Sequence, residues 1–140
     1  MSGKSPKIAS LIAPFEGHGK DAHYLGFFEC FNQQLFFEAH EVLEELWLSE
    51  RGGPRDLFFK GLIQLAGAFV HVQKGRFAPA TALFGLAKNN LGLYPSLYEG
   101  FDTVDASRLI DEWIGVVNCA EPGTNLLVTR GTPRLRLQFV

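Results

Sequence analysis

The chain has 140 residues, of which 46% are hydrophobic, and a formal net charge of −2. This length suits one globular domain with a substantial core, and the small negative charge lacks the basic surface that binds phosphates, so we expect no nucleic-acid partner. No apolar run reaches membrane-spanning length, and the first residues lack the continuous apolar segment of a leader. We therefore expect no membrane partner. Because its two cysteines, Cys30 and Cys119, lie far apart, we expect a cytoplasmic protein without disulfides.

The predicted elements are helices. Residues 1–20 mix glycine, proline, lysine and serine, which predicts a lead-in segment with no element of its own. A single helical domain over residues 21–120 then begins with Asp21, a suitable N-cap for the first helix, which ends near Asn32. The later helices are predicted over about residues 35–49, 54–74, 79–93 and 104–118.

The C-terminal segment, residues 121–140, alternates apolar and polar side chains from Leu135 to Phe139, which is the period of an extended strand. We expect this tail to pack on the helical domain or on a partner subunit. Short loops between consecutive helices favour antiparallel neighbours. The predicted fold is therefore all-α, a compact bundle of about five helices with a short extended C-terminal tail. A homodimer through exposed aromatic side chains or the tail is a further expectation.

The second predicted helix carries a histidine and a glutamate one turn apart among large apolar side chains. At about 100° per residue, one face of this helix holds Phe36, His40, Leu43, Glu44 and Trp47. About 100–160° away lies a second set, in which we expect a solvated stripe: Glu38, Glu41 and Glu45. Since burying a bare carboxylate is costly, we expect Glu44 to be paired, hydrogen-bonded or metal-bound beside His40.

The spacing of this pair permits metal binding. The run His40-Glu41-Val42-Leu43-Glu44 has the form H-E-x-x-E, one residue different from the zincin motif H-E-x-x-H. His40 and Glu44 are therefore candidate ligands of zinc, manganese or iron, and Glu41, or alternatively Glu44, is the candidate base that acts on a bound water. Because two ligands do not complete a catalytic site, we expect the third helix to supply another, with His71 as the candidate.

A polar stripe along the third helix has two interpretations. Lys60, Gln64 and His71 lie within about 40° of one another, with Gly61 and Gly67 beside them. In the first interpretation, the small residues let this helix approach the second closely, so that Gln64 and His71 reach the histidine–glutamate pair. In the second, the stripe is the solvated edge of a buried helix.

The motif also resembles that of a known family. The residues that carry the resemblance are Phe31-Asn32, Phe36-Phe37-Glu38-Ala39-His40-Glu41, Glu44-Glu45-Leu46-Trp47 and Gly61-Leu62-Ile63-Gln64. They resemble the domain-of-unknown-function 309 family of bacteria and archaea, which is marked by a histidine, a glutamate four residues later and an aromatic residue three beyond that. Gln34 stands where that family usually has glycine. The resemblance covers about residues 27–95 and implies a small all-α fold, a metal-binding role for the motif and no known substrate.

Three functions stay open at this point. The first is a metal-dependent hydrolase in which His40 and Glu44 hold a divalent ion together with His71 or Gln64. The second is a non-catalytic helical module for binding or self-association, in which His40, Glu44 and Gln64 form a structural polar network. The third is a small-molecule pocket on the third helix, with three further lining residues: Phe36, Trp47 and Asn32.

Overall fold

The computed structural model describes residues 6–17, 21–121 and 123–138. Over these residues the chain forms seven α-helices, one 3₁₀ turn and one pair of short strands. In chain order the elements are α1 (Pro6–Ile12), η1 (Ala13–Phe15), α2 (Ala22–Asn32), α3 (Phe36–Glu50), α4 (Asp56–Gln73), α5 (Phe77–Leu91), β1 (Leu97–Tyr98), β2 (Phe101–Asp102), α6 (Thr103–Cys119) and α7 (Leu126–Thr129). The predicted all-α fold is confirmed, and the five predicted helices correspond to α2–α6.

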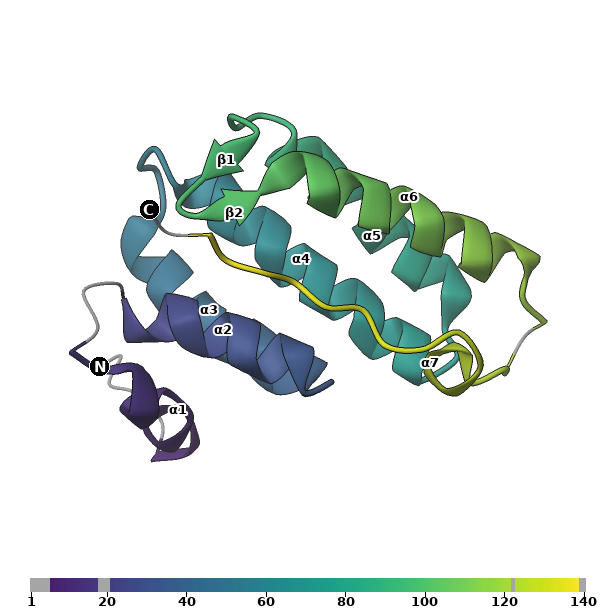
Figure 1. Ribbon diagram of the computed structural model, residues 1–140, viewed down its shortest axis with the longest axis horizontal. Helices are drawn as coiled ribbons and strands as arrows, with labels where there is room; N and C mark the ends of the chain where they lie inside the picture. The colour runs from purple at the N-terminus through teal and green to yellow at the C-terminus, as the bar shows by residue number, and fades with distance from the viewer. Residues whose placement is uncertain (1–5, 18–20, 122, 139–140) are drawn as a thin grey trace.

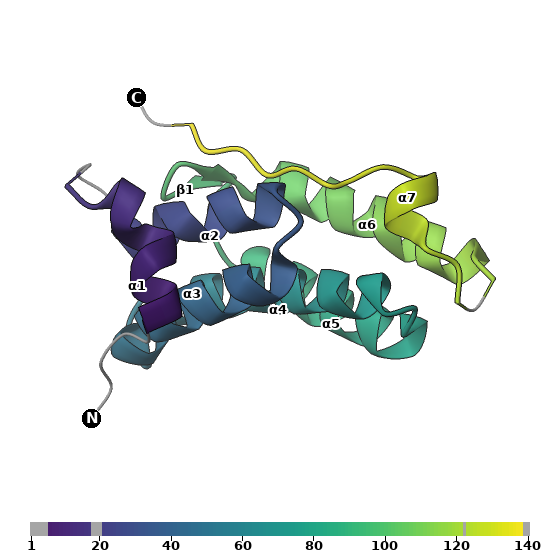
Figure 2. The ribbon, with the colours of Figure 1, turned by 90° about the horizontal axis from the view of Figure 1, so that it is seen from below.

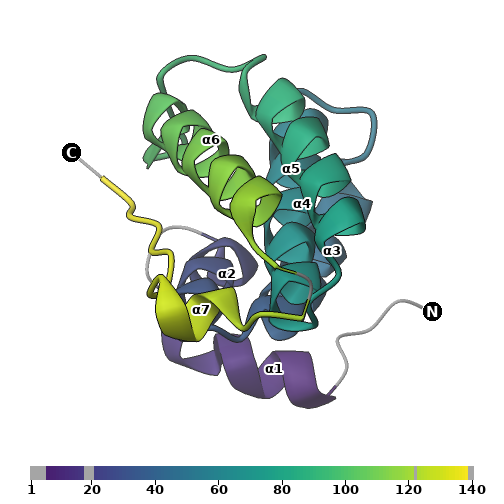
Figure 3. The same ribbon diagram turned by 90° about the vertical axis from the view of Figure 1, so that its right-hand side faces the viewer.

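The helices form two layers (Figure 2). One layer contains α3, α4 and α5, with α4 in the middle. The other contains α2 and α6, and the C-terminal tail runs between these two helices, across α4 (Figure 1). The end-on view in Figure 3 shows the same separation, with α1 lying outside both layers near one end of the molecule.

Side-chain caps start two of the helices. The carboxylate of Asp21 accepts a hydrogen bond from the His23 backbone N–H at 2.8 Å, as the predicted N-cap of α2 requires. Asp102 caps α6 in the same way, through the backbone N–H of Asp105 at 2.8 Å. Pro54 precedes α4 by two residues rather than opening it, because the turn after Glu50 extends to Arg55.

Helix α1 lies in the segment for which the sequence predicts no element. Its apolar side chains Ile8 and Ile12 are buried against Val42 of α3, in a cluster separate from the main core. Gly26 of α2 allows this contact, since a Cβ there would lie 3.2 Å from the Ile12 Cγ2 atom. Ile8, Leu11 and Ile12 span little more than one turn, which is too short a periodic signal to identify a helix of seven residues.

The β1–β2 hairpin and α7 were also not predicted. The two strands pair antiparallel around Glu99 and Gly100, which both have positive φ angles, 50° and 73°. A turn-rich link is all that the sequence indicates there, because two-residue strands have no detectable period. α7 is a single turn of four residues.

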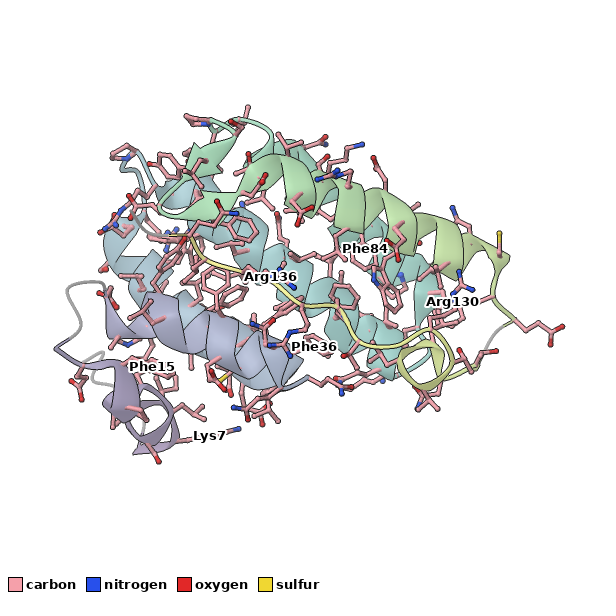
Figure 4. The ribbon with its side chains drawn as sticks, in the orientation of Figure 1. Lys7, Phe15, Phe36, Phe84, Arg130 and Arg136 are labelled. Atoms are coloured by element: carbon pink, nitrogen blue, oxygen red, sulfur yellow. The ribbon has the colours of Figure 1, made fainter. Side chains whose placement is uncertain are left out.

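The two layers meet through aromatic rings. Figure 4 shows Phe36 and Phe84, which are fully buried. The ring of Phe69 on α4 stacks on Phe36 at 5.2 Å between centroids and meets Phe84 edge-on at 5.1 Å. It also meets Phe31 of α2 at 5.5 Å and Trp113 of α6 at 5.1 Å, both edge-on. Such pairs add about 0.5–1.5 kcal/mol each beyond the burial of their area.

The tail lies on the helices of its own chain. The Asn32 side chain binds the Leu135 backbone twice, accepting from its N–H at 2.7 Å and donating to its C=O at 2.8 Å. Leu137 forms a bridge with Phe101 of β2, and the Gln138 N–H donates to the Gly100 C=O at 2.6 Å. The predicted strand would include Phe139, which lies outside the described residues.

No helix in the described part of the chain has both the length and the hydropathy needed to cross a bilayer.

Replacing Asn32 by alanine should release the tail. The substitution removes both hydrogen bonds to Leu135 and leaves a backbone N–H and C=O without their partner, so we expect the free energy of unfolding to fall by about 1–3 kcal/mol. Urea unfolding measures this change, and amide exchange at Leu135 and Gln138 should become faster. Asn32→Asp keeps the acceptor and should cost less; equal stability of Asn32→Ala and wild type would contradict this role.

Candidate functional site

Three of the predicted site residues line one groove of about 310 Å³. His40 comes from α3, whereas Gln64 and His71 come from α4. The other walls of this groove are apolar or small: Phe37, Ile63, Gly67, Val70 and Leu83. The groove lies along the partly exposed stripe of α4, since the buried residues of this helix face the core.

Both interpretations of the α4 stripe are therefore partly correct. The stripe is partly solvated, with Lys60 exposed and Gln64 and His71 half-buried. It also brings Gln64 and His71 into the same groove as His40. The glycines do not produce this approach, because Gly61 faces Leu91 of α5 and Gly67 faces Leu83 of α5.

The histidine–glutamate pair forms a local ion pair on α3. His40 Nε2 lies 3.6 Å from Glu44 Oε2, and their side chains are 30% and 46% exposed. The ring of Phe37, itself 48% exposed, lies 5.7 Å from the His40 ring between centroids. Glu44 is thus a half-exposed carboxylate beside the groove rather than a buried one.

The prediction that Glu38, Glu41 and Glu45 form the solvated stripe of α3 is wrong, because all three side chains are less exposed than Glu44. The side chains of Glu38, Glu41 and Glu45 are 27%, 34% and 22% exposed, each less than that of Glu44. The cause is tertiary. Lys7 of α1 lies 3.5 Å from both Glu38 and Glu41, and His23 of α2 lies 3.3 Å from Glu45. Figure 4 shows Lys7 on α1, the helix that the sequence did not predict.

Glu41 is consequently directed away from the groove. Its Oε1 atom lies 3.5 Å from Lys7 Nζ, and Glu41 is not among the residues that line the groove. The geometry gives no support to a role for Glu41 as a base acting beside His40 and His71.

His71 is the most unusual polar group of the groove. Its Nδ1 atom is buried and has no hydrogen-bond partner among the described residues. Burial lowers the pKa of His71 below its usual 6.5, and the positive charges of Arg76 and Lys74 lower it further. The imidazole is therefore neutral at neutral pH, with one ring nitrogen that donates and one that accepts.

Gln64 is held in place by a residue of α5. Its Oε1 atom accepts a hydrogen bond from Asn90 Nδ2 of α5 at 2.8 Å, which leaves its amide N–H₂ as the group that can donate to a ligand. Gln64 therefore belongs to a contact between α4 and α5. The predicted polar network with His40 and Glu44 is replaced by this contact and by the separate His40–Glu44 pair.

The remaining predicted lining residues lie elsewhere. Phe36 is fully buried in the aromatic core, and Asn32 holds the tail. The Trp47 indole N–H donates to Asp56 Oδ1 at 2.7 Å, and the Arg51 guanidinium lies 5.3 Å from its ring. Trp47 thus joins the end of α3 to the start of α4. The sequence does not predict the hydrogen bond between Trp47 and Asp56, because Asp56 is simply an acidic residue in the first turn of the next helix.

The groove also contains residues that the sequence analysis did not select. Phe37, Val70 and Leu83 form much of its apolar wall. Their available signal was weak: Ile63 and Val70 are apolar residues seven apart, about 100–120° round α4 from Gln64. No group of three histidine, cysteine, aspartate or glutamate side chains within the described residues is arranged to hold a metal ion.

Comparison with known proteins agrees with the sequence resemblance. A family model described as "Domain of unknown function (DUF309)" matches residues 24–83. The uncharacterized protein YpuF of Bacillus subtilis (strain 168) is 32% identical over 93 residues, which are 54% of this chain and 53% of YpuF. The chain thus matches about half the length of that relative. No solved structure gives a significant match.

Adding a methyl group at Gly61 tests the contact that positions Gln64 and Asn90. A Cβ at Gly61 would lie 3.0 Å from Leu91 Cγ and 3.2 Å from Asn90 Cβ, so Gly61→Ala should lower the free energy of unfolding by about 1–3 kcal/mol. Gly85 of α5 is the matched control, because a Cβ there meets nothing within 4 Å. Gly85→Ala should stabilise the protein by about 0.5–1 kcal/mol. Urea unfolding of both variants would reveal the difference in sign.

The lowered pKa of His71 predicts a pH dependence of stability. Below the usual pKa of 6.5 the unfolded chain binds a proton that the folded His71 does not, so stability falls as the pH decreases toward the folded pKa. Replacement by glutamine should remove this contribution. The difference in unfolding free energy between wild type and His71→Gln should therefore change between about pH 7.5 and about pH 5.5, in the direction that favours wild type at higher pH. A constant difference would show that His71 titrates alike in both states.

Proposed function

Residues 24–83 match the model of the DUF309 family, whose description names no activity, so we propose a function from the geometry of the groove. The protein is a non-catalytic binding module that takes a small, largely apolar ligand in the groove on α3, α4 and α5. The observation that supports this most is the shared position of His40, Gln64 and His71 among apolar walls.

The polar groups of the groove indicate which ligand it would take. The Gln64 amide N–H₂ can donate, and neutral His71 provides one donor, so both suit an oxygen acceptor on the ligand. Phe37, Ile63 and Val70 provide apolar contact for the remainder of the molecule. Ligand pockets commonly combine apolar walls with a few polar groups that fix orientation. We therefore propose a compact apolar molecule with a carboxylate or carbonyl group.

Titration with small apolar acids tests this proposal. Benzoate, phenylacetate and hexanoate, added to ¹⁵N-labelled protein, should shift the amide resonances of residues that line the groove. Gly67→Leu should abolish these shifts, because the new side chain fills the groove beside Leu83, whose Cδ1 atom already lies 3.4 Å from the position of a Cβ. Gly85→Leu is the control: it adds the same side chain on α5 at an open position outside the groove.

His71→Leu separates polar recognition from simple apolar binding. This variant keeps an apolar wall but removes the donor, so it should weaken binding of each acid more than binding of the corresponding hydrocarbon. Unchanged spectra with all three acids, or equal binding by the Gly67→Leu variant, would argue against a ligand groove.

Metal binding is the second candidate, and the position of two histidines in one groove favours it. His40 and His71 would be ligands, and Glu44 could turn toward the ion because its side chain is half-exposed. Elemental analysis of protein purified without a metal-affinity step checks this candidate. Zinc, manganese or iron bound to wild type and lost from both His40→Ala and Glu44→Gln would favour a metal site over the apolar-ligand groove. A metal-dependent hydrolase would need a base other than Glu41.

A further inference from the structure

A second cavity, of about 520 Å³, lies on the other layer of the molecule between α6 and the tail. The tail runs antiparallel to α6 beside it (Figure 1). We call this space the tail cleft. Its floor is apolar, formed by the buried side chains of Phe101, Ala106 and Leu135 and the half-buried Leu109.

The two walls of the tail cleft carry opposite charges. The tail provides Arg134 and Arg136, both exposed, while α6 provides Glu112. None of the ion pairs formed within the described residues includes any of these three side chains. Figure 4 shows Arg136 on the tail, between α2 and α6.

The other charged groups of the cleft already have partners. Arg108 donates to Asp105 Oδ1 at 2.8 Å, and the Asp102 carboxylate caps α6. With these included, the lining has three arginines and three acids, so its formal charge is zero. A site of zero net charge with separated charges is suited neither to a simple anion nor to a simple cation, but to a ligand that carries both.

We propose that the tail cleft binds a small zwitterion with an apolar body, of the class of short apolar peptides and amino acids. The ligand carboxylate would meet Arg134 and Arg136, and its ammonium group would meet Glu112. Its apolar side chain would cover Leu109 and Ala106 on the floor. The volume lies within the range of about 300–1,000 Å³ that small-molecule sites occupy, and it has room for a dipeptide.

This site is independent of the groove that carries the proposed function. The groove is lined by residues of α3, α4 and α5, whereas the tail cleft is lined by residues 101–112 and 134–138. The two cavities share no residue, so failure of one proposal leaves the other unaffected.

Binding of leucyl-leucine, compared with its capped forms, tests the proposal. Isothermal titration of the full chain should show saturable binding at millimolar concentration. The N-acetyl dipeptide and the dipeptide amide should each bind about fivefold more weakly, since each lacks one charge and the charged groups of the cleft are exposed. Amide resonances of Ala106 and Leu109 should shift with the free dipeptide.

Two variants test which wall of the tail cleft binds the ammonium group of the ligand and which binds its carboxylate. Glu112→Gln should bind the free and N-acetyl dipeptides equally, because the partner of the ammonium group is gone. The double variant Arg134→Gln and Arg136→Gln should bind the free dipeptide and its amide equally. Circular dichroism checks that these exposed substitutions leave the fold intact.

Matched controls come from charged residues on α6 and at the end of α7 that do not line the cleft. Asp111→Asn on α6 and Arg130→Gln beside α7 should bind leucyl-leucine as wild type does. Absence of saturable binding to wild type would overturn the proposal. So would equal binding of free and capped dipeptides, or shifts confined to the groove residues Ile63 and Val70.

Discussion

The contact of the Phe69 ring with four other rings is the interaction on which the rest of the structure depends. Its partners come from four different helices: Phe31, Phe36, Phe84 and Trp113. Through them α4 is fixed to both neighbours in its own layer and to both helices of the opposite layer. Because protein interiors are packed to crystal-like density, this ring also fixes the rotation of α4 about its axis. The polar stripe therefore faces outward, and the direction of Gln64 and His71 is set by a residue that touches no ligand.

The same rotation explains why this protein has a groove rather than a buried polar centre. A helix with one wholly buried face needs no further partner on its outer side, so half-buried groups such as His71 can remain without full hydrogen bonding. The neighbours of α4 differ in how closely they approach. Gly61 and Gly67 bring α5 against α4, whereas α3 carries the larger Phe37 and His40 at the groove. The groove opens beside these two α3 side chains, with Leu83 of α5 on its lining as well.

The periodicity of the sequence predicts features that lie within a single helix. The limits of α2–α6, the N-cap Asp21 and the common face of His40 and Glu44 all follow from local spacing. The placement of Gln64 and His71 near His40 was one of two open alternatives, since the angle of a stripe does not identify the helix opposite it. Burial of Glu38 and Glu41 could not be predicted, because it depends on Lys7 from a helix with only two buried anchors. Trp47 and Asn32 are predicted site residues, but Trp47 joins the end of α3 to the start of α4, and Asn32 holds the tail.

The attachment of the tail also has a consequence for the order in which the chain folds. Contacts among α3, α4 and α5 join neighbours in sequence, so they close short loops and can form early. Asn32 and Leu135, by contrast, are separated by 103 residues. During synthesis the seam between α2 and α6 stays uncovered after α6 has emerged, until residues 134–138 have also left the ribosome. Completion of the core is thereby linked to the arrival of Leu135, and a chain truncated before that residue would expose apolar side chains of the core to other proteins.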